Sequence, residues 1–122
     1  MFFRFYFLDL HMLPQKNRIN KKLFPLFIKK AKTFSSENLY LKVAHDCQKE
    51  KAFAFVASLK VSKKAVERNR LKRRARAVTY PLLKDVPAGT CAAVFFKPTI
   101  MGKKYAEIKN EILSLYKKAK II

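Results

Sequence analysis

The stretch KKAVERNRLKRRAR, Lys63–Arg76, carries eight basic side chains and a single acidic one. Within it and just beyond it, Leu71, Ala75 and Val78 recur at intervals of four and three residues, which is the spacing of one helix face. A disordered basic tail would not need that apolar spacing. The pattern therefore predicts a helix with one face packed on a core and the opposite face covered with cations.

The residues around this helix predict its limits and its neighbours. Ser62 is expected to be its N-cap, and Pro81 ends it after about Tyr80. Before it, Leu39–Val43 and Lys51–Lys60 have the composition of strands, and the polar turn between them predicts a hairpin. The basic helix then connects the second of these strands to the next one.

Three further segments complete the predicted order of elements. A short helix is expected near Leu23, with Pro25 in its first turn. Cys91–Lys97 is an apolar run of strand length, and after Gly102 apolar residues return every three or four positions, as in an amphipathic helix. The order helix, strand, strand, helix, strand, helix predicts an α+β fold, an α/β sandwich in which helices cover one small sheet.

Composition narrows the class of partner. The chain has 122 residues, of which 50% are hydrophobic, enough for one compact domain and too few for two separate cores. Its formal net charge is +20, which opposes a compact state unless a polyanion screens it. Nucleic acid is the expected partner. A solvated cationic surface and attraction to an anionic membrane leaflet are the alternatives.

Residues 1–11, MFFRFYFLDLH, are crowded with aromatic side chains and differ from the basic sequence that follows. They are fewer than the ~20 apolar residues that cross a membrane, and they lack the cleavage site of a secretory signal. We expect a dispensable extension, with translation starting at Met12 in place of Met1 and residues 12–122 forming a single domain. The protein is then expected to be cytoplasmic, with no membrane partner.

The sequence predicts no catalytic residues and no metal ligands. Cys47 and Cys91 are the only cysteines and lack CxxC spacing, so we expect reduced thiols. His11 and His45 lie far apart in the sequence, and no Cys/His pair has the spacing of metal ligands. The eight carboxylates are scattered along the chain and indicate neither an acid–base pair nor a metal cluster.

The segment SLKVSKKAVERNRLKRRAR, with the triplet RNR at 68–70, closely resembles the signature of the bacterial ribonuclease P protein subunit. The likeness covers nearly all of the chain from Met12 onward, because KNRINKKLF at 16–24, KKAKTF at 29–34 and VFFKP at 94–98 are similar to further motifs of that family. It implies an α/β fold in which the signature helix forms a left-handed crossover between strands.

The resemblance also implies a function. Proteins of that family assist a catalytic RNA, whose active site uses Mg²⁺, in the endonucleolytic removal of the 5′ leader from precursor tRNA. We therefore expect the non-catalytic protein of a ribonucleoprotein, with ribonuclease P RNA and precursor tRNA as partners, no cofactor bound by the protein itself and no obligate protein partner. A ribosomal or general RNA-binding protein with no role in cleavage is the alternative.

One surface implied by the resemblance is the cationic face of the signature helix. We expect it to bind the ribonuclease P RNA, because Arg can hold two phosphate oxygens at once. The residues assigned to it are Lys63, Lys64, Arg68, Asn69, Arg70, Lys72, Arg73 and Arg76. The alternative is that these are solvated charges on an amphipathic helix.

A second implied surface is a cleft between the first helix and the sheet, where aromatic rings stack on the bases of the single-stranded leader. Phe24 matches the first cleft aromatic of the family, Ile28 stands at the second with Phe27 beside it, and Tyr40 substitutes for a strand aromatic that falls near Lys42. Core packing is the alternative for the two phenylalanines. The full set is Phe24, Phe27, Ile28, Tyr40, Lys42, Ser58 and Lys60, with further basic contacts from Lys16, Arg18, Lys21 and Lys22.

Overall fold

The computed structural model describes residues 13, 15–19 and 21–122 of the chain. The predicted extension at residues 1–11, and the choice between Met1 and Met12 as the start, lie outside the described residues.

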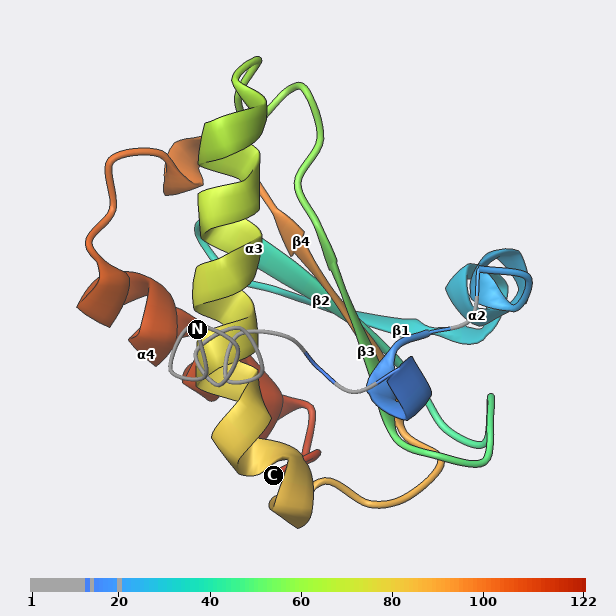
Figure 1. Cartoon of the computed structure of the whole chain (residues 1–122). Helices are drawn as coiled ribbons and strands as arrows, with labels where there is room; N and C mark the ends of the chain where they lie inside the picture. The colour runs from blue at the N-terminus through green and yellow to red at the C-terminus, as the bar shows by residue number, and fades with distance from the viewer. Residues whose placement is uncertain (1–12, 14, 20) are drawn as a thin grey trace, which may run out of the picture.

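The described chain forms three layers, with two helices on one face of a four-stranded sheet and a short helix on the other (Figure 1). The strands are β1 (Lys32–Ser35), β2 (Leu39–Ala44), β3 (Ala52–Val56) and β4 (Cys91–Phe96). The helices are α2 (Phe24–Lys30), α3 (Ala65–Thr79) and α4 (Tyr105–Lys118), with 3-10 turns at Gln15–Asn17, Tyr80–Asp85 and Pro98–Ile100. The predicted α+β fold is confirmed.

The predicted hairpin of β2 with β3 is wrong. The sheet order is β1-β2-β4-β3, so that β4 lies between them, antiparallel to β2 and parallel to β3. The most apolar strand takes a central place because both of its faces are covered, and β4 has buried residues almost throughout. The hairpin partner of β2 is β1, which the sequence did not predict because KTFS is a short, mostly exposed edge strand.

The larger core lies between the sheet and the pair α3 and α4. The apolar stripe predicted on the basic helix is confirmed, since Leu71, Ala75 and Val78 are all buried in it. Near the end of this stripe, the Tyr116 hydroxyl of α4 lies 2.6 Å from Thr79 Oγ1 of α3, and Thr79 in turn donates to the Ala75 carbonyl. Burial raises the pKa of Tyr116, so this hydroxyl stays protonated and serves as a fixed link between the two helices.

A smaller core lies under α2, on the opposite face of the sheet. Phe27 is buried there against small residues of three strands, Ala44, Ala52, Cys91 and Ala93, which allow the helix to approach closely. Pro25 lies in the first turn of α2, as predicted.

The expectation of reduced thiols is wrong for this structure. Cys47 of the β2–β3 loop and Cys91 of β4 are joined as a disulfide. The two cysteines are 44 positions apart in sequence, and only the antiparallel pairing of Ala44 with Cys91 brings the loop beside β4. Spacing along the chain therefore held no signal for the pair.

The start of α3 is also displaced from its predicted cap. The N-cap is Lys64, not Ser62. The Ser62 hydroxyl accepts the Lys64 N–H (3.1 Å) and donates to Glu67 (2.6 Å), so it closes a turn just before the helix and joins that turn to the helix's first acidic residue. At the other end the chain leaves α3 through the 3-10 turn that contains Pro81.

Glu111 of α4 ties the β1–β2 hairpin to the helix layer. Its carboxylate accepts hydrogen bonds from the Ser36 hydroxyl and from the backbone and side-chain amides of Asn38 (2.8 and 2.9 Å). Burial raises the pKa of Glu111, but these hydrogen bonds and the charge of Lys97 outweigh burial and hold the pKa below its ordinary value of 4.5.

We therefore expect Glu111→Gln to lower the free energy of unfolding by about 2 kcal/mol at pH 7. Because the folded-state pKa is depressed, the contribution of the carboxylate is complete above pH 4.5 and is lost as the pH falls through the folded pKa. Urea unfolding between pH 3 and 7 should then bring wild type and variant together at the acidic end. Glu37→Gln, at an exposed position, is the control, and a gap that stays constant with pH would contradict this role.

No helix in the described part of the chain has the length and apolar character needed to cross a membrane.

Candidate nucleic-acid interface

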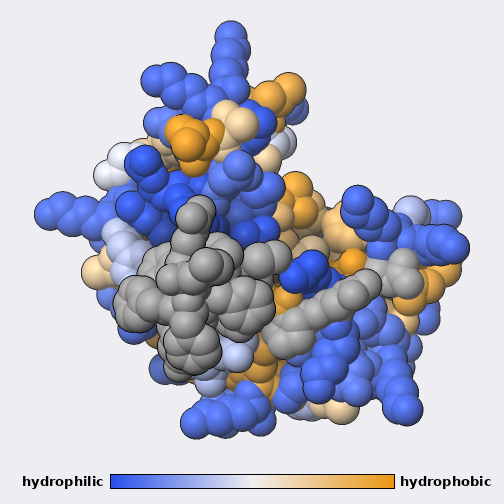
Figure 2. Space-filling model, in the orientation of Figure 1, coloured by the Kyte–Doolittle hydropathy of each residue, from blue (hydrophilic) through white to orange (hydrophobic). Residues whose placement is uncertain are grey.

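The cationic face of α3 is confirmed as a surface of the folded domain. Asn69, Arg70 and Arg73 are exposed, as are Lys63 and Lys64 just before the helix, while the remaining assigned cations, Arg68, Lys72 and Arg76, are half-buried. Figure 2 shows hydrophilic side chains gathered over α3, beside an apolar strip that lies toward the sheet. A burial stripe on one side and cations on the other follow from the same helical period.

Arg68 differs from its neighbours because it supports the local fold. Its guanidinium donates to the Ser62 carbonyl oxygen (2.9 Å), across the turn that precedes α3. Removing this side chain would disturb the helix start as well as any RNA contact. Arg70 and Arg73, which are exposed, are cleaner probes of binding.

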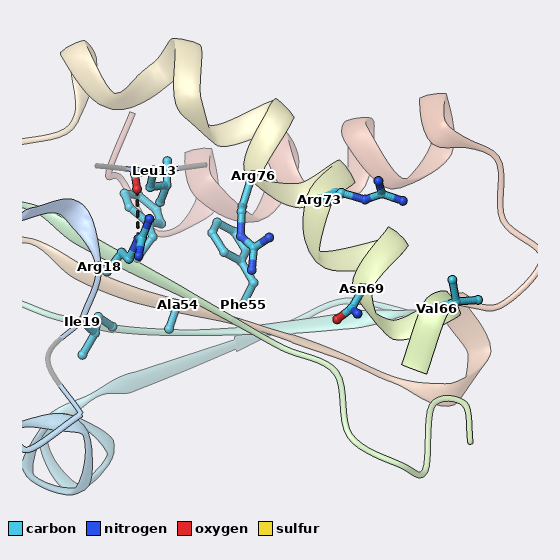
Figure 3. Close-up of a pocket in the computed structure, with 10 residues that line it drawn as sticks. Leu13, Arg18, Ile19, Ala54, Phe55, Val66, Asn69, Arg73 and Arg76 are labelled. Carbon is cyan, nitrogen blue, oxygen red and sulfur yellow. Dashed lines mark hydrogen bonds between the residues drawn. The ribbon is translucent and has the colours of Figure 1, made fainter. Parts of the chain in front are cut away.

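The structure brings Arg18 to the same surface, although the sequence assigned it to a separate basic group. The segment after the first 3-10 turn runs along the free side of β3, where the Ile19 N–H donates to the Phe53 carbonyl (3.4 Å). Arg18 Nε donates to the Leu13 carbonyl (2.9 Å), which orients its side chain (Figure 3). Burial lowers the pKa of Arg76, and repulsion from Arg18 and Arg73 lowers it further. These three guanidiniums thus share one electrostatic environment.

The other assigned basic residues of the N-terminal segment are Lys16, Lys21 and Lys22. Lys16 is exposed on the first 3-10 turn, and Lys21 and Lys22 are exposed in the turn that leads into α2. All three precede α2 in the sequence, and their expected RNA contacts stay a prediction.

The opposite face of the sheet carries the second candidate surface. Tyr40 and Lys42 lie on the same face of β2 as buried Ala44, at every second position, so they face the α2 side. The ring of Tyr40 stacks on that of Phe95, with ring centroids 4.7 Å apart and planes inclined by 2°. Both are half-buried, and their pairing across β2 and β4 fixes an aromatic platform.

Phe95 is the residue of this platform that sequence reasoning missed. The sequence of β4 ends in two adjacent phenylalanines, and adjacent residues of a strand point to opposite faces. Phe96 is buried in the larger core, so Phe95 has to face the other side. The signal was present in the FF pair but required knowing which face α2 covers.

Phe27 and Phe24 turn out to have different environments. Phe27 is 1% exposed and is a core residue, which corrects its assignment to the cleft. Phe24 and Ile28 are half-buried at the edge of the same cluster, and the Phe24 ring lies 5.8 Å from that of Phe27. The alternative of core packing is therefore correct for Phe27 and partly correct for Phe24.

Polar groups border the aromatic platform. Lys42 donates to the Thr33 hydroxyl (3.0 Å), and Lys97 donates to the Ser35 hydroxyl (2.9 Å) and to the Ser36 carbonyl (2.6 Å). Ser58 and Lys60 are exposed in the loop after β3, at the same end of the sheet as the platform, because Val56 pairs with Phe95. The arrangement offers stacking surface, hydroxyls and ammonium groups in one strip.

Neither surface has the composition of a metal centre. Among the residues that the structure describes, no three His, Cys, Asp or Glu side chains gather where they could hold a metal ion. Both surfaces are built from cations, aromatic rings and small polar groups, which is chemistry for binding a polyanion.

Comparison with known proteins decides the family. The family model of Ribonuclease P matches residues 13–120. The chain belongs to this ribonuclease P protein family. It is 43% identical over 70 residues to the ribonuclease P protein component of Microcystis aeruginosa, a match that spans 57% of this chain and 58% of that protein. With the ribonuclease P protein component of a Pseudanabaena strain it shares 31% identity over 113 residues, 91% of this chain and 97% of that protein.

Solved ribonuclease P proteins have the same fold. A Staphylococcus aureus RNase P protein, a mutant with defective mRNA degradation activity, superimposes with a TM-score of 0.82 at 20% identity, covering 96% of this chain and 98% of that one. The RNase P protein from Thermotoga maritima gives a TM-score of 0.72 at 21% identity, covering 83% and 96%. The family inferred from the signature helix is confirmed by the family match over residues 13–120.

Proposed function

We propose that this chain is the protein component of ribonuclease P and that its two surfaces bind two different RNAs. The α3 face would bind the RNA subunit, and the strip around Tyr40 and Phe95 would bind the 5′ leader of precursor tRNA. The observation that carries the proposal is the separation of these surfaces. Cations cluster on the helix side, whereas the stacked aromatic pair lies on the α2 side of the sheet.

The chemistry of each surface supports its proposed partner. Exposed guanidiniums suit the phosphates of a structured RNA, which they hold without reading bases. Aromatic rings suit a single strand with unpaired bases, since every base has a face that can stack, and such binding tolerates many leader sequences. We propose Phe24, Ile28, Lys42, Ser58 and Lys60 as further leader contacts.

Cleavage itself is assigned to the RNA subunit in this proposal. The endoribonuclease reaction would then use Mg²⁺ held by RNA, and the protein would contribute binding of the leader and relief of repulsion between two polyanions. We further propose that residues 12–122 form the working domain, in keeping with a family match over residues 13–120.

Reconstitution tests the function. The full chain is added to the ribonuclease P RNA of its own genome, and 5′ processing of a precursor tRNA is followed at low Mg²⁺ concentration. We expect faster cleavage than with RNA alone. A ribosomal or general RNA-binding protein would leave the rate unchanged and would bind a ribosomal RNA fragment as tightly as the ribonuclease P RNA in a competition assay.

The aromatic platform makes a separate prediction. Tyr40→Ala removes one stacking partner and should weaken binding of precursor tRNA to the assembled particle by about tenfold. Binding of mature tRNA, which has no leader, should not change. Tyr105→Ala on α4, an exposed tyrosine far from the platform in sequence and on the other side of the sheet, is the matched control. Equal losses for precursor and mature tRNA would argue against leader contact at Tyr40.

A further inference from the structure

A pocket of about 630 Å³ lies where α3, β3 and the segment Arg18–Ile19 meet (Figure 3). Its volume is within the range of sites that hold small organic ligands. Its lining is divided by chemistry. Phe53, Phe55, Leu13 and Ile19 contribute apolar surface, while Arg18, Asn69, Arg73 and Arg76 contribute polar groups. Binding the phosphates of a double helix would need the cations but not the apolar floor.

The cations at this pocket lack a compensating charge. Asn69, Arg73 and Arg76 follow one another at intervals of four and three residues, so they lie on one side of α3. Arg18 reaches the same place from the N-terminal segment, and Figure 3 shows Arg76 directed from α3 toward Phe55. No carboxylate is among the lining residues in the described part of the chain. Repulsion among the three guanidiniums would be relieved by a bound anion.

The apolar side of the pocket has a ring and a strand edge. Phe55 is half-buried and lies nearly parallel to the buried Phe53 ring, with centroids 6.4 Å apart and planes inclined by 11°. The Phe53 carbonyl accepts the Ile19 N–H at the outer edge of β3. Backbone groups of a strand point to the same edge at every second residue, so the N–H and carbonyl of Phe55 point to this outer edge as well. β3 ends the sheet order, and in the described chain only the bridge at Arg18 and Phe53 extends it.

We propose that this pocket receives one unpaired nucleotide of an RNA, with its phosphate held by Arg18, Arg73 and Arg76 and its base lying against Phe55. A nucleotide matches all parts of the lining at once: an anion for the guanidiniums, a flat ring for the aromatic floor, and donors and acceptors for the strand edge and Asn69. The inference rests on the proposed function for the source of the RNA. It adds that the α3 surface holds an extruded base as well as backbone phosphates.

The test is an NMR titration of the ¹⁵N-labelled full chain with AMP and with ribose 5-phosphate, which carries the same phosphate without a base. We expect AMP to shift the backbone amide of Phe55 and the side-chain N–H signals of Arg73 and Arg76, and to bind about tenfold more tightly than ribose 5-phosphate. Identical shifts and equal affinities for the two probes would reduce the pocket to a plain anion patch and overturn the proposal. A third titration, with a Glu- and Asp-rich peptide, overturns it too if the peptide binds the β3 edge more tightly than AMP.

Three variants locate the binding. Arg73→Gln should weaken AMP binding about tenfold, whereas Arg70→Gln, which removes the same charge from the same helix outside this pocket, should leave it unchanged. Phe55→Leu keeps an apolar side chain but removes the ring, and should abolish the preference for AMP over ribose 5-phosphate. Peak dispersion in the same spectra reports whether each variant is folded. Equal effects of the two arginine variants would contradict the assignment.

The pocket and the proposed function fail separately. If the chain stimulates cleavage in the reconstitution assay but does not distinguish AMP from ribose 5-phosphate, only the nucleotide pocket is wrong. If AMP binds as expected and the chain does not stimulate cleavage, the pocket stands and the ribonuclease P role falls.

Discussion

The double variant Arg70→Ala with Arg73→Ala should bind the ribonuclease P RNA about 100-fold more weakly, roughly tenfold for each lost guanidinium. Both side chains are exposed, so their removal should leave the domain folded. Each phosphate contact that is lost also leaves its counterion on the RNA. The slope of log K against log salt should therefore fall by about two for the double variant and by about one for each single variant.

A matched control separates contact from general charge. Lys109→Ala with Lys118→Ala removes two cations from exposed positions of α4. It lowers the net charge equally but should reduce the salt slope by much less. Affinity is measured by filter binding across a series of KCl concentrations. If both double variants lose the same affinity and the same slope, the α3 face is a solvated cationic surface with no special place in binding.

Phe27→Ala should have the largest effect on stability, a loss of about 3–5 kcal/mol in the free energy of unfolding. The ring is 1% exposed and is the centre of the small core under α2, where its neighbours on the sheet are mainly alanines. These short side chains cannot move in to fill the cavity. Because α2 has only seven residues, it depends on this contact to stay docked.

Urea unfolding checks this expectation, and Leu26→Ala on the same short helix is the control. Leu26 is 59% exposed, so its truncation should change stability by less than about 0.5 kcal/mol. Phe24→Ala should spare assembly with the RNA subunit and weaken leader binding, because Phe24 is half-buried at the edge of the small core under α2. A small effect of Phe27→Ala would mean that the layer under α2 is not a core.

Local patterns predicted most individual elements of this fold. The spacing of Leu71, Ala75 and Val78 predicted α3 and its buried side, and the apolar run at Cys91–Lys97 predicted β4. A helix or a central strand can be predicted in this way because its apolar residues recur with the period of the element or form a continuous run. β1 escaped prediction because an edge strand with one half-buried side chain has no such period.

Pairing across the sheet could not be predicted in the same way. The strand β4 begins at Cys91, after α3, and yet it lies between β2 and β3 in the sheet. Because β2 and β3 follow one another in the sequence, they were wrongly predicted to form a hairpin. The disulfide between Cys47 and Cys91 and the platform of Tyr40 and Phe95 depend on that insertion. Each of these two pairs includes a residue of β4, which only the strand order brings beside its partner.

The sequence by itself determined that this is a small basic α+β domain with one amphipathic cationic helix, and its motifs determined the ribonuclease P family. Periodicity shows which side of an element is apolar, and the net charge of the chain shows which class of partner the protein attracts. Only the tertiary structure decided that Phe27 is buried while Phe95 is half-buried on the α2 side of the sheet, and that Arg18 lies beside Arg73 and Arg76. The reason is physical: burial and electrostatic environment depend on groups that are distant in sequence, and the order of the strands decides which of them meet.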